Sequence, residues 1–291
     1  MRQNKLKIFI SGSNGFIGAH IKKKLIQKFN LITPSKNKLN LNNLKKVKKY
    51  IKKHKPDIII HLAASTKFLS NRNSEKKNQI KNTFNLTKNL VKSINDECKL
   101  VIFFGSIEEY GNSKFPSRES QTVKPISIYG KYKYKSYLYV SKILKKKKLN
   151  YVWLRPSLTF GPGDNKERYL GYIINSIKKN KKFYVQPGNQ IRDYLYINDL
   201  CKVLILIINN YQKKYNFVLN ISSKNYIKIK SIPKMIEKIL NKKINFNLKK
   251  LKKKEINLYN SNEKLLKLFP NLKFTSFKKG LINTLKDEYV L

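Results

Sequence analysis

The sequence predicts an α/β protein with a doubly wound parallel sheet and a smaller, interleaved C-terminal lobe. Short apolar runs of strand length alternate with amphipathic segments of helical period as far as about residue 160. The first apolar run ends in a glycine-rich turn that opens a helix, and beyond residue 160 the alternation loosens. Such alternation places helices on both faces of a parallel sheet, which is the Rossmann type of architecture.

The expected strands are short apolar runs bounded by breaking residues. Pro34 ends the second run, and Pro56 separates the third run from the helix before it. The third run is apolar almost throughout, as is typical of a strand buried on both faces. We expect strands at residues 7–10, 31–33, 57–62, 100–104 and 151–155.

The expected helices carry apolar residues three or four positions apart. In the first of them Ile21, Leu25 and Ile26 share one face. We expect helices at residues 19–29, 44–54, 80–94 and 129–145. The elements together predict a Rossmann domain over 1–160, to which segments at about 190–222 return, and a smaller lobe built mainly from 161–291.

The net charge of +48 comes almost entirely from lysine, because only six of the 64 basic residues are arginine. The lysines are spread over every expected helix, as on ordinary solvated faces. Proteins that read nucleic acid rely on arginine for bidentate contacts. We therefore expect no specific nucleic-acid partner, although polyanions would adhere to this chain at low ionic strength.

Membrane, metal and disulfide patterns are not found in the sequence. The longest uninterrupted aliphatic run, 203–208, is too short to cross a bilayer, and no segment has the pattern of a signal peptide. Cys98 and Cys201 have neither metal-binding nor disulfide spacing, and the three histidines are scattered. We expect no membrane partner, no metal and a reducing, cytoplasmic setting.

The glycine-rich turn has the spacing G-x-x-G-x-x-G. Gly12 allows a sharp turn, Gly15 lets the backbone approach a phosphate, and Gly18 lets the helix pack closely on its strand. Backbone amides at such a helix N-terminus attract anions. The turn predicts a dinucleotide site, with an ordinary glycine-rich turn as the alternative.

Tyr129 and Lys133 place a phenol and an ammonium group one turn apart on the same helix face. A neighbouring cation favours the phenolate and lowers the phenol pKa toward a range useful for proton transfer. The spacing alone is uninformative, because two other Tyr-x-x-x-Lys pairs occur in this lysine-rich chain, at Tyr110 and Tyr226.

The surroundings favour the pair at Tyr129. Ser106 follows the strand at 100–104, which places its hydroxyl at the carboxyl edge of the sheet, where ligands bind. Tyr129 lies at a helix start that could face the same edge. Ser106 would then bond a substrate oxygen while Tyr129 transfers its proton, and the alternative for Ser106 is a turn cap.

These motifs, taken in order, resemble the extended short-chain dehydrogenase/reductase family, in particular its NAD(P)-dependent nucleotide-sugar epimerases, dehydratases and 4-ketoreductases. The matching segments run nearly from end to end of the chain: 12–18, 61–64, 105–111, Tyr129 with Lys133, 155–165 and 190–199. The resemblance implies a cytoplasmic enzyme that supplies building blocks for surface polysaccharides.

The resemblance implies a role for each matching residue. Ser106, Tyr129 and Lys133 would be catalytic, and Lys133 would also hold the nicotinamide ribose. The implied cofactor-binding residues are Gly12, Asn14, Gly15, Phe16, Ile17, Gly18, Ser35, Lys36, Leu62, Ala63, Ala64, Tyr129, Lys133 and Pro156. Ser106, Glu108 and Arg192 would contact a nucleotide-diphosphate sugar, with Arg192 on the diphosphate. The alternative for Arg192 is a surface ion pair with Asp193.

Three departures from the family pattern narrow the reaction and the cofactor. Ile107 stands where 4,6-dehydratases carry an acid, which disfavours the elimination of water but leaves Glu108 as an acid–base group. The second strand leads to Ser35 and Lys36 with no carboxylate, which favours NADP(H) and leaves NAD(H) possible. Leu158 replaces an asparagine that contacts substrate in many relatives, which leaves the substrate pose open.

Three functions follow from these observations. The first is NADPH-dependent reduction of a nucleotide-linked 4-keto-6-deoxyhexose. The second is a nucleotide-sugar 4-epimerase with tightly bound NAD. The third, of another class, is a non-catalytic dinucleotide-binding protein with a polyanion-binding surface. The resemblance also implies a homodimer formed through a four-helix bundle that includes the Tyr129 helix.

Overall fold

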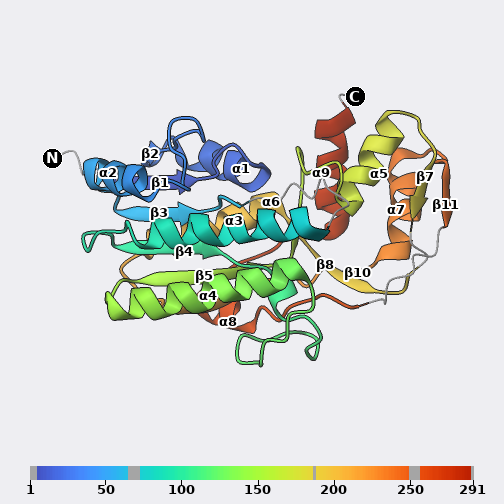
Figure 1. Ribbon diagram of the computed structural model, residues 1–291. Coiled ribbons are helices and arrows are strands. Elements are labelled where there is room, and N and C mark those ends of the chain that lie inside the picture. The colour runs from blue at the N-terminus through green and yellow to red at the C-terminus, as the bar shows by residue number, and fades with distance from the viewer. Residues whose placement is uncertain (1–4, 65–72, 186–187, 249–255, 290–291) are drawn as a thin grey trace. The chain divides into compact units, whose positions relative to one another are not determined.

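The computed structural model describes residues 5–64, 73–185, 188–248 and 256–289 (Figure 1). The strands are β1 (Lys7–Ser11), β2 (Asn30–Ile32), β3 (Ile58–His61), β4 (Leu100–Phe104), β5 (Tyr151–Pro156), β6 (Leu158–Phe160), β7 (Phe183–Val185), β8 (Ile191–Tyr196), β9 (Phe217–Ile221), β10 (Tyr226–Lys228) and β11 (Phe246–Leu248). The helices are α1 (Phe16–Leu25), α2 (Leu44–His54), α3 (Asn73–Val91), α4 (Ile128–Lys146), α5 (Tyr169–Lys178), α6 (Ile197–Asn209), α7 (Ile232–Leu240), α8 (Glu263–Leu268) and α9 (Phe277–Tyr289), with short 3₁₀ turns η1 (Ile107–Glu109) and η2 (Ile229–Ser231).

A six-stranded sheet in the order β2-β1-β3-β4-β5-β9 forms the centre of the fold. β1 pairs in parallel with β2 on one side and with β3 on the other, so the strand order reverses between β1 and β3. β3–β4 and β4–β5 are parallel as well. In an open α/β sheet the ligand crevice lies at the carboxyl ends of the strands beside such a reversal. The predicted doubly wound α/β fold is confirmed.

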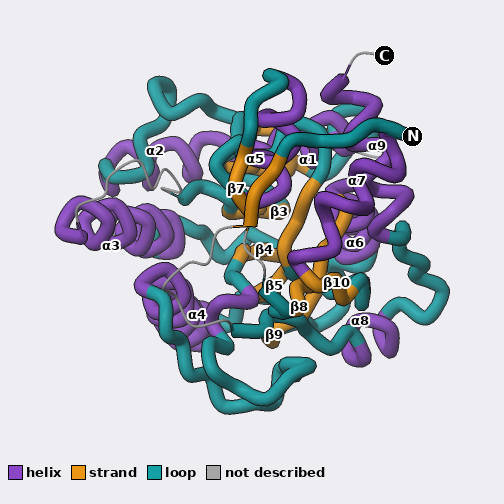
Figure 2. Tube along the Cα trace, turned by 90° about the vertical axis from the view of Figure 1, so that its right-hand side faces the viewer, coloured by secondary structure: helices purple, strands orange, loops and turns teal. Residues whose placement is uncertain are grey.

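Helices cover both faces of this sheet. α2, α3 and α4 lie on one side of the strands, and α1 and α6 lie on the other (Figure 2). The first face is closed by buried apolar residues from helices and strands alike: Phe9, Val47, Ile51, Ile59, Leu90, Val91, Val101, Phe103, Val140, Leu144 and Trp153. Side chains alternate along a strand, so Ile8 and Ile10 are buried on the opposite face from Phe9.

The chain divides into two compact units. The first comprises 1–113, 121–155 and 201–219, and the second comprises 114–120, 156–200 and 220–291. The second unit contains a three-stranded sheet, β10-β8-β6, and a two-stranded one, β11-β7. The division falls at 155/156 because β6, directly after β5, pairs with β8. The segment that returns to the first unit is 201–219, and 114–120 belongs to the second.

The observed elements differ from the expected ones mainly at helix ends. α1 runs over Phe16–Leu25 instead of 19–29, and Ile26, expected on its core face, is 55% exposed. The chain leaves the helix after Leu25, because 26–28 form a turn that leads into β2. α3 begins at residue 73 instead of 80. α2 and β4 have the expected bounds.

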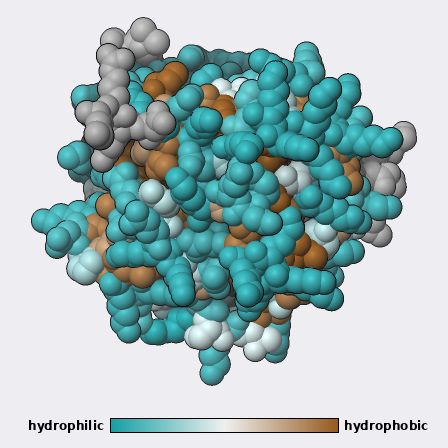
Figure 3. Space-filling view, turned by 90° about the vertical axis from the view of Figure 1, so that its left-hand side faces the viewer, coloured by the Kyte–Doolittle hydropathy of each residue, from teal (hydrophilic) through white to brown (hydrophobic). Residues whose placement is uncertain are grey.

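In α2 the lysines lie at positions that face solvent. Lys45, Lys46, Lys48 and Lys49 are exposed, whereas Val47 between them is buried. Figure 3 shows hydrophilic side chains over most of the face that it presents, with small apolar areas between them. Among the described residues, no helix is long and apolar enough to cross a membrane.

Helix α2 provides a direct test of the local structure. The Asn43 side chain accepts a hydrogen bond from the Lys46 backbone N–H, which caps the helix N-terminus. We expect Asn43→Ala to lower the free energy of unfolding by about 1 kcal/mol, measured by urea denaturation. Asn42→Ala is the control, because Asn42 lies one residue before this cap. Equal losses in the two variants would contradict the capping role.

Candidate active site

The glycine-rich turn is built as a tight cradle between β1 and α1. Gly12 has φ +75°, and a Cβ there would lie 2.8 Å from the Ala63 backbone nitrogen. A Cβ on Gly18 would lie 2.2 Å from the Gly12 carbonyl oxygen, so only glycine lets α1 come this close. At Gly15 an added Cβ would meet the Gly12 oxygen alone, at 3.4 Å. The turn is therefore closed on its inner side and open at Gly15, which fits a pyrophosphate at the N-terminus of α1.

A chain of hydrogen bonds supports this turn from below. His61, buried at the end of β3, lies with Nδ1 2.7 Å from Ser11 Oγ and Nε2 3.0 Å from Thr87 Oγ1. Thr87 donates its own proton to the Thr83 carbonyl, so it accepts from His61 Nε2–H. Nδ1 is then the acceptor for Ser11 Oγ–H, and Ser11 Oγ accepts the Ala63 N–H at 3.3 Å.

Burial lowers the pKa of His61 to about 3, with a smaller contribution from the positive charge of Lys133. The imidazole is thus neutral, as the direction of the bonds requires. In the sequence His61 is one of three scattered histidines and begins the matching segment 61–64, and this role for it was not predicted. The pairing of β1 with β3, which places Ser11 opposite His61, was the signal that could have revealed it.

Ser106 follows β4 after one residue, as predicted, and is the N-cap of η1. Its hydroxyl accepts a hydrogen bond from the Glu108 N–H at 3.2 Å, so Ser106 caps this turn, which was its alternative role. The cap uses a lone pair of the hydroxyl and leaves its O–H as a donor toward a substrate oxygen. The two roles of Ser106 are therefore compatible.

Contacts between η1 and α4 connect Ser106 with Tyr129. The Ser127 hydroxyl donates to Glu108 Oε2 at 2.6 Å and accepts the Gly130 N–H at 2.9 Å, which caps α4. A Cβ on Gly130 would lie 2.3 Å from the Glu108 carbonyl oxygen, so glycine is needed for this close packing. The first turn of α4, which carries Tyr129, is thereby fixed against the turn that carries Ser106.

Lys133 lies one turn further along α4, half-buried. Its Nζ is 5.7 Å from the centroid of the Tyr129 ring and donates to the Phe104 carbonyl oxygen at 2.6 Å. Burial lowers the pKa of Lys133 to about 8, and the Glu109 carboxylate opposes that shift. The structure thus brings the three predicted catalytic residues to one edge of the sheet.

The segment after β2 has the predicted chemistry at its surface. Ser35 and Lys36 are exposed, and the Ser35 hydroxyl accepts the Lys38 N–H at 3.3 Å. Residues 33–38 contain no carboxylate. This arrangement offers a hydroxyl and cations to an anionic group.

Of the remaining predicted residues, Pro156 and Arg192 lie in the second unit, and the others lie in the first. Arg192, in β8, donates through Nη1 to the carbonyl oxygens of Ile191 and Ile256. Asp193 is fully buried and accepts from the hydroxyls of Ser157 at 2.5 Å and Ser223 at 3.3 Å, and burial raises its pKa. Asp193 has no exposed surface, so an ion pair between it and Arg192 would not lie at the surface.

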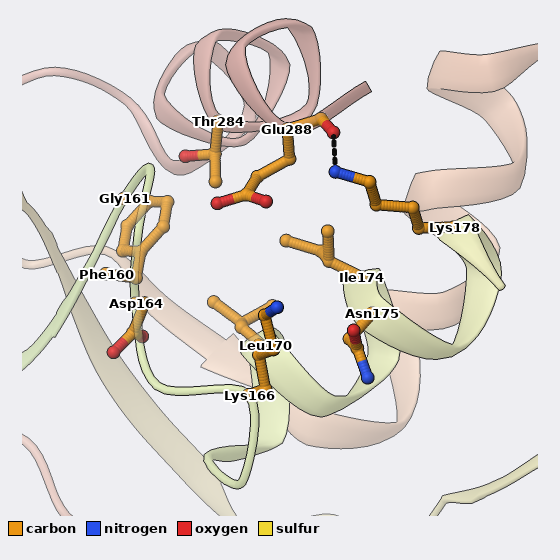
Figure 4. A pocket seen from close by; sticks show the side chains of 11 residues that line it. Phe160, Gly161, Asp164, Lys166, Leu170, Ile174, Asn175, Lys178, Thr284 and Glu288 are labelled. Atoms are coloured by element: carbon orange, nitrogen blue, oxygen red, sulfur yellow. Dashed lines mark hydrogen bonds between the residues drawn. The ribbon is translucent and has the colours of Figure 1, made fainter. Parts of the chain in front are cut away.

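The second unit also holds a small pocket between α5, α9 and the turn at 161–164 (Figure 4). Phe160, Leu170 and Ile174 form its apolar wall. Glu288 Oε1 accepts the Gly163 N–H at 2.8 Å, and the Glu288 carbonyl accepts from Lys178 Nζ at 2.8 Å. These bonds fix the turn and α5 to α9. The pocket was not predicted from the sequence.

Comparisons with known proteins agree on one family. The model of the NAD dependent epimerase/dehydratase family matches residues 8–222. A GDP-6-deoxy-D-talose 4-dehydrogenase from Aggregatibacter actinomycetemcomitans is 31% identical over 213 residues, 70% of each chain. A putative UDP-glucose 4-epimerase from Methanocaldococcus jannaschii is 26% identical over 226 residues, 69% of this chain and 73% of the relative.

Two solved structures show the same fold. A GDP-mannoheptose C4 reductase from Campylobacter jejuni with NADP bound has a TM-score of 0.83 at 20% identity, covering 100% of both chains. A UDP-glucose 4-epimerase from Thermotoga maritima with UDP-glucose has a TM-score of 0.82 at 20% identity, covering 97% of this chain and 98% of that one.

The buried imidazole predicts an acid-sensitive stability. The pKa of His61 is 6.5 when exposed and about 3 when folded, so the unfolded state binds the extra proton between these values. This contribution to stability is complete above pH 6.5 and falls by about 1.4 kcal/mol per unit as the pH drops. His61→Gln should flatten the acid slope of the free energy of unfolding, measured by urea titration between about pH 4 and pH 7.

An acid slope that stays the same in the His61 variant would contradict a neutral, buried imidazole.

Proposed function

The chain belongs to the NAD dependent epimerase/dehydratase family of nucleotide-sugar epimerases, dehydratases and reductases, and from this premise we propose that it reduces a nucleotide-linked 4-keto-6-deoxyhexose with NADPH. It is an NAD(P)-dependent enzyme, and the reaction at C4 is the finer proposal. The observation that carries it is the packing of η1 on α4, which holds Ser106, Tyr129 and Lys133 at the carboxyl edge of the sheet.

Each of the three residues has a distinct task. A dinucleotide held by the glycine-rich turn would supply the hydride for the carbonyl carbon. Tyr129 donates a proton to the carbonyl oxygen, so that ketone, hydride and proton together give the alcohol. Lys133 stabilises the phenolate that Tyr129 becomes. Ser106 donates a hydrogen bond to the same oxygen and orients it.

The surroundings of Ser106 favour reduction over dehydration. Ile107 is 1% exposed, so its side chain belongs to the core. Elimination of water needs an acid and a base beside the sugar, and position 107 supplies neither. Glu108 is held by Ser127 at the start of α4 and is proposed to contact the substrate.

NADP(H) is the cofactor that the proposal names, with NAD(H) as the alternative. The exposed Ser35 and Lys36 offer a hydroxyl and a cation, which suit a 2′-phosphate better than a free 2′-hydroxyl. The proposed cofactor site is completed by the glycine-rich turn, by Leu62, Ala63 and Ala64 after β3, and by Lys133 and Pro156.

The proposed substrate carries a nucleoside diphosphate. Arg192 is proposed to pair with its phosphates, since a planar guanidinium binds them in a bidentate manner. Relatives named as 4-epimerases make that reaction the second candidate, with NAD regenerated in each cycle. We also propose a homodimer through α3 and α4, which pack on each other and carry the exposed Leu138.

The test is loss of absorbance at 340 nm with NADPH or NADH and a panel of nucleotide-linked 4-keto-6-deoxyhexoses. NADPH should be consumed in proportion to product and faster than NADH. Tyr129→Phe should lower kcat by about 10²–10⁴-fold, because the proton donor is removed. Tyr139→Phe, further along α4, should retain activity.

A sugar nucleotide that changes configuration without net loss of NADPH would overturn the reductase in favour of the epimerase. Full activity of Tyr129→Phe would contradict the assignment of the proton donor.

A further inference from the structure

A buried ion pair lies beneath Ser106. Glu109 and Arg155 are 0% and 1% exposed, and Arg155 Nε donates to Glu109 Oε2 at 2.9 Å. The other carboxylate oxygen, Oε1, accepts the Ser106 backbone N–H at 2.8 Å and the Trp153 indole N–H at 3.0 Å. The Arg155 guanidinium also lies over the Tyr110 ring, 4.5 Å from its centroid. The Glu109 carboxylate thus links β5 to the catalytic turn.

Stability alone does not account for this pair. Removing two charges from water costs several kcal/mol per ion, and apolar replacements of such pairs are often neutral or stabilising. A buried ion pair that directly bonds the backbone of a catalytic residue therefore points to a role at the site.

The backbone at Gly105 packs closely against the Glu109 carboxylate and the Trp153 indole. A Cβ on Gly105 would lie 2.2 Å from Glu109 Oε1 and 2.2 Å from Trp153 Nε1, so any larger residue would collide with both. The Gly105 N–H donates to the Leu154 carbonyl at 2.7 Å, which holds the end of β4 against β5. Glycine at position 105 leaves room for the Glu109 carboxylate to pack against the backbone that leads to Ser106.

The same carboxylate acts on Lys133. Lys133 Nζ is bonded to the carbonyl of Phe104, two residues before Ser106. The Glu109 charge raises the pKa of Lys133 against the larger effect of burial. Among the described residues, His61 on β3, which is neutral, and Tyr129 on α4 also lie near Lys133. Arg155 on β5 is paired with Glu109.

We propose that Glu109, held by Arg155 and Trp153, is a positioning residue for this site: it fixes the Ser106 backbone and supplies the negative charge that Lys133 faces. Its catalytic consequence rests on the function proposed above. Its effect on Lys133 is a property of the protein alone and can be measured without substrate.

Trp153 is the single tryptophan of the chain and therefore a specific probe. Protein labelled with ¹⁵N-tryptophan gives one indole N–H resonance, from the group that donates to Glu109. We expect this resonance to titrate with a midpoint near the pKa of Lys133, about 8. In Lys133→Met the titration should disappear. In Glu109→Gln the midpoint should fall by about one pH unit, because the opposing charge is lost.

Activity provides the second readout. Glu109→Gln should lower kcat by about tenfold at neutral pH, with little change in KM. It should also shift the alkaline limb of the kcat–pH profile to lower pH, as it shifts the midpoint of the indole resonance. Asp57→Asn is the matched control. Asp57 also accepts from a backbone N–H, that of Lys7 at 2.8 Å, and pairs with Lys99 at 2.8 Å, but it lies before β3. This variant should lose stability without moving either midpoint.

Glu109→Gln leaves Arg155 buried without its charged partner and could unfold the protein. The double variant Glu109→Gln with Arg155→Met removes both charges and should stay folded, with the lowered midpoint. A folded variant of either kind with an unchanged midpoint overturns the inference. A shifted midpoint in a protein that reduces no 4-keto sugar would instead refute the proposed function alone.

Discussion

The packing of η1 against the first turn of α4 is the constraint on which the rest of the site depends. Ser106 and Tyr129 come from different parts of the chain and meet only because Gly130 admits the Glu108 carbonyl and Ser127 bonds the Glu108 carboxylate. The sheet supplies the frame for this contact, because β4 ends where η1 begins. The geometry of the proposed site therefore depends on two glycines that admit close neighbours: the Glu109 and Trp153 side chains at Gly105 and the Glu108 backbone at Gly130.

Buried polar groups complete that frame at the carboxyl ends of the strands. His61 connects β1, β3 and α3 through hydroxyl groups, and Glu109 connects η1 and β5 through a charge. Buried groups of this kind are tolerated only when they are fully bonded, and the direction of each bond then fixes one arrangement. The glycine-rich turn and η1 thus rest on neighbouring polar networks, one neutral and one ionic.

The sequence predicted the elements, and it placed the proposed catalytic residues at one sheet edge, because both follow from local pattern. Apolar period and proline breaks located α2 and β4, and the order of the strands placed Ser106 and Tyr129 at one edge. It did not predict that Ile26 is exposed, since a helical period does not show where a helix ends. It missed the roles of Glu109 and His61, because their partners are set by strand pairing and by helix packing on the sheet. In a chain with this many charged residues, nothing local marks one glutamate as buried.

The most direct test of the account is the fate of the hydride. NADPH that carries deuterium at the transferred position is incubated with a nucleotide-linked 4-keto-6-deoxyhexose, and the product is analysed by NMR. The account predicts one deuterium at C4 of the sugar for each NADP⁺ formed. A product with hydrogen from another source at C4, or oxidation of NADPH without a labelled sugar, would contradict it.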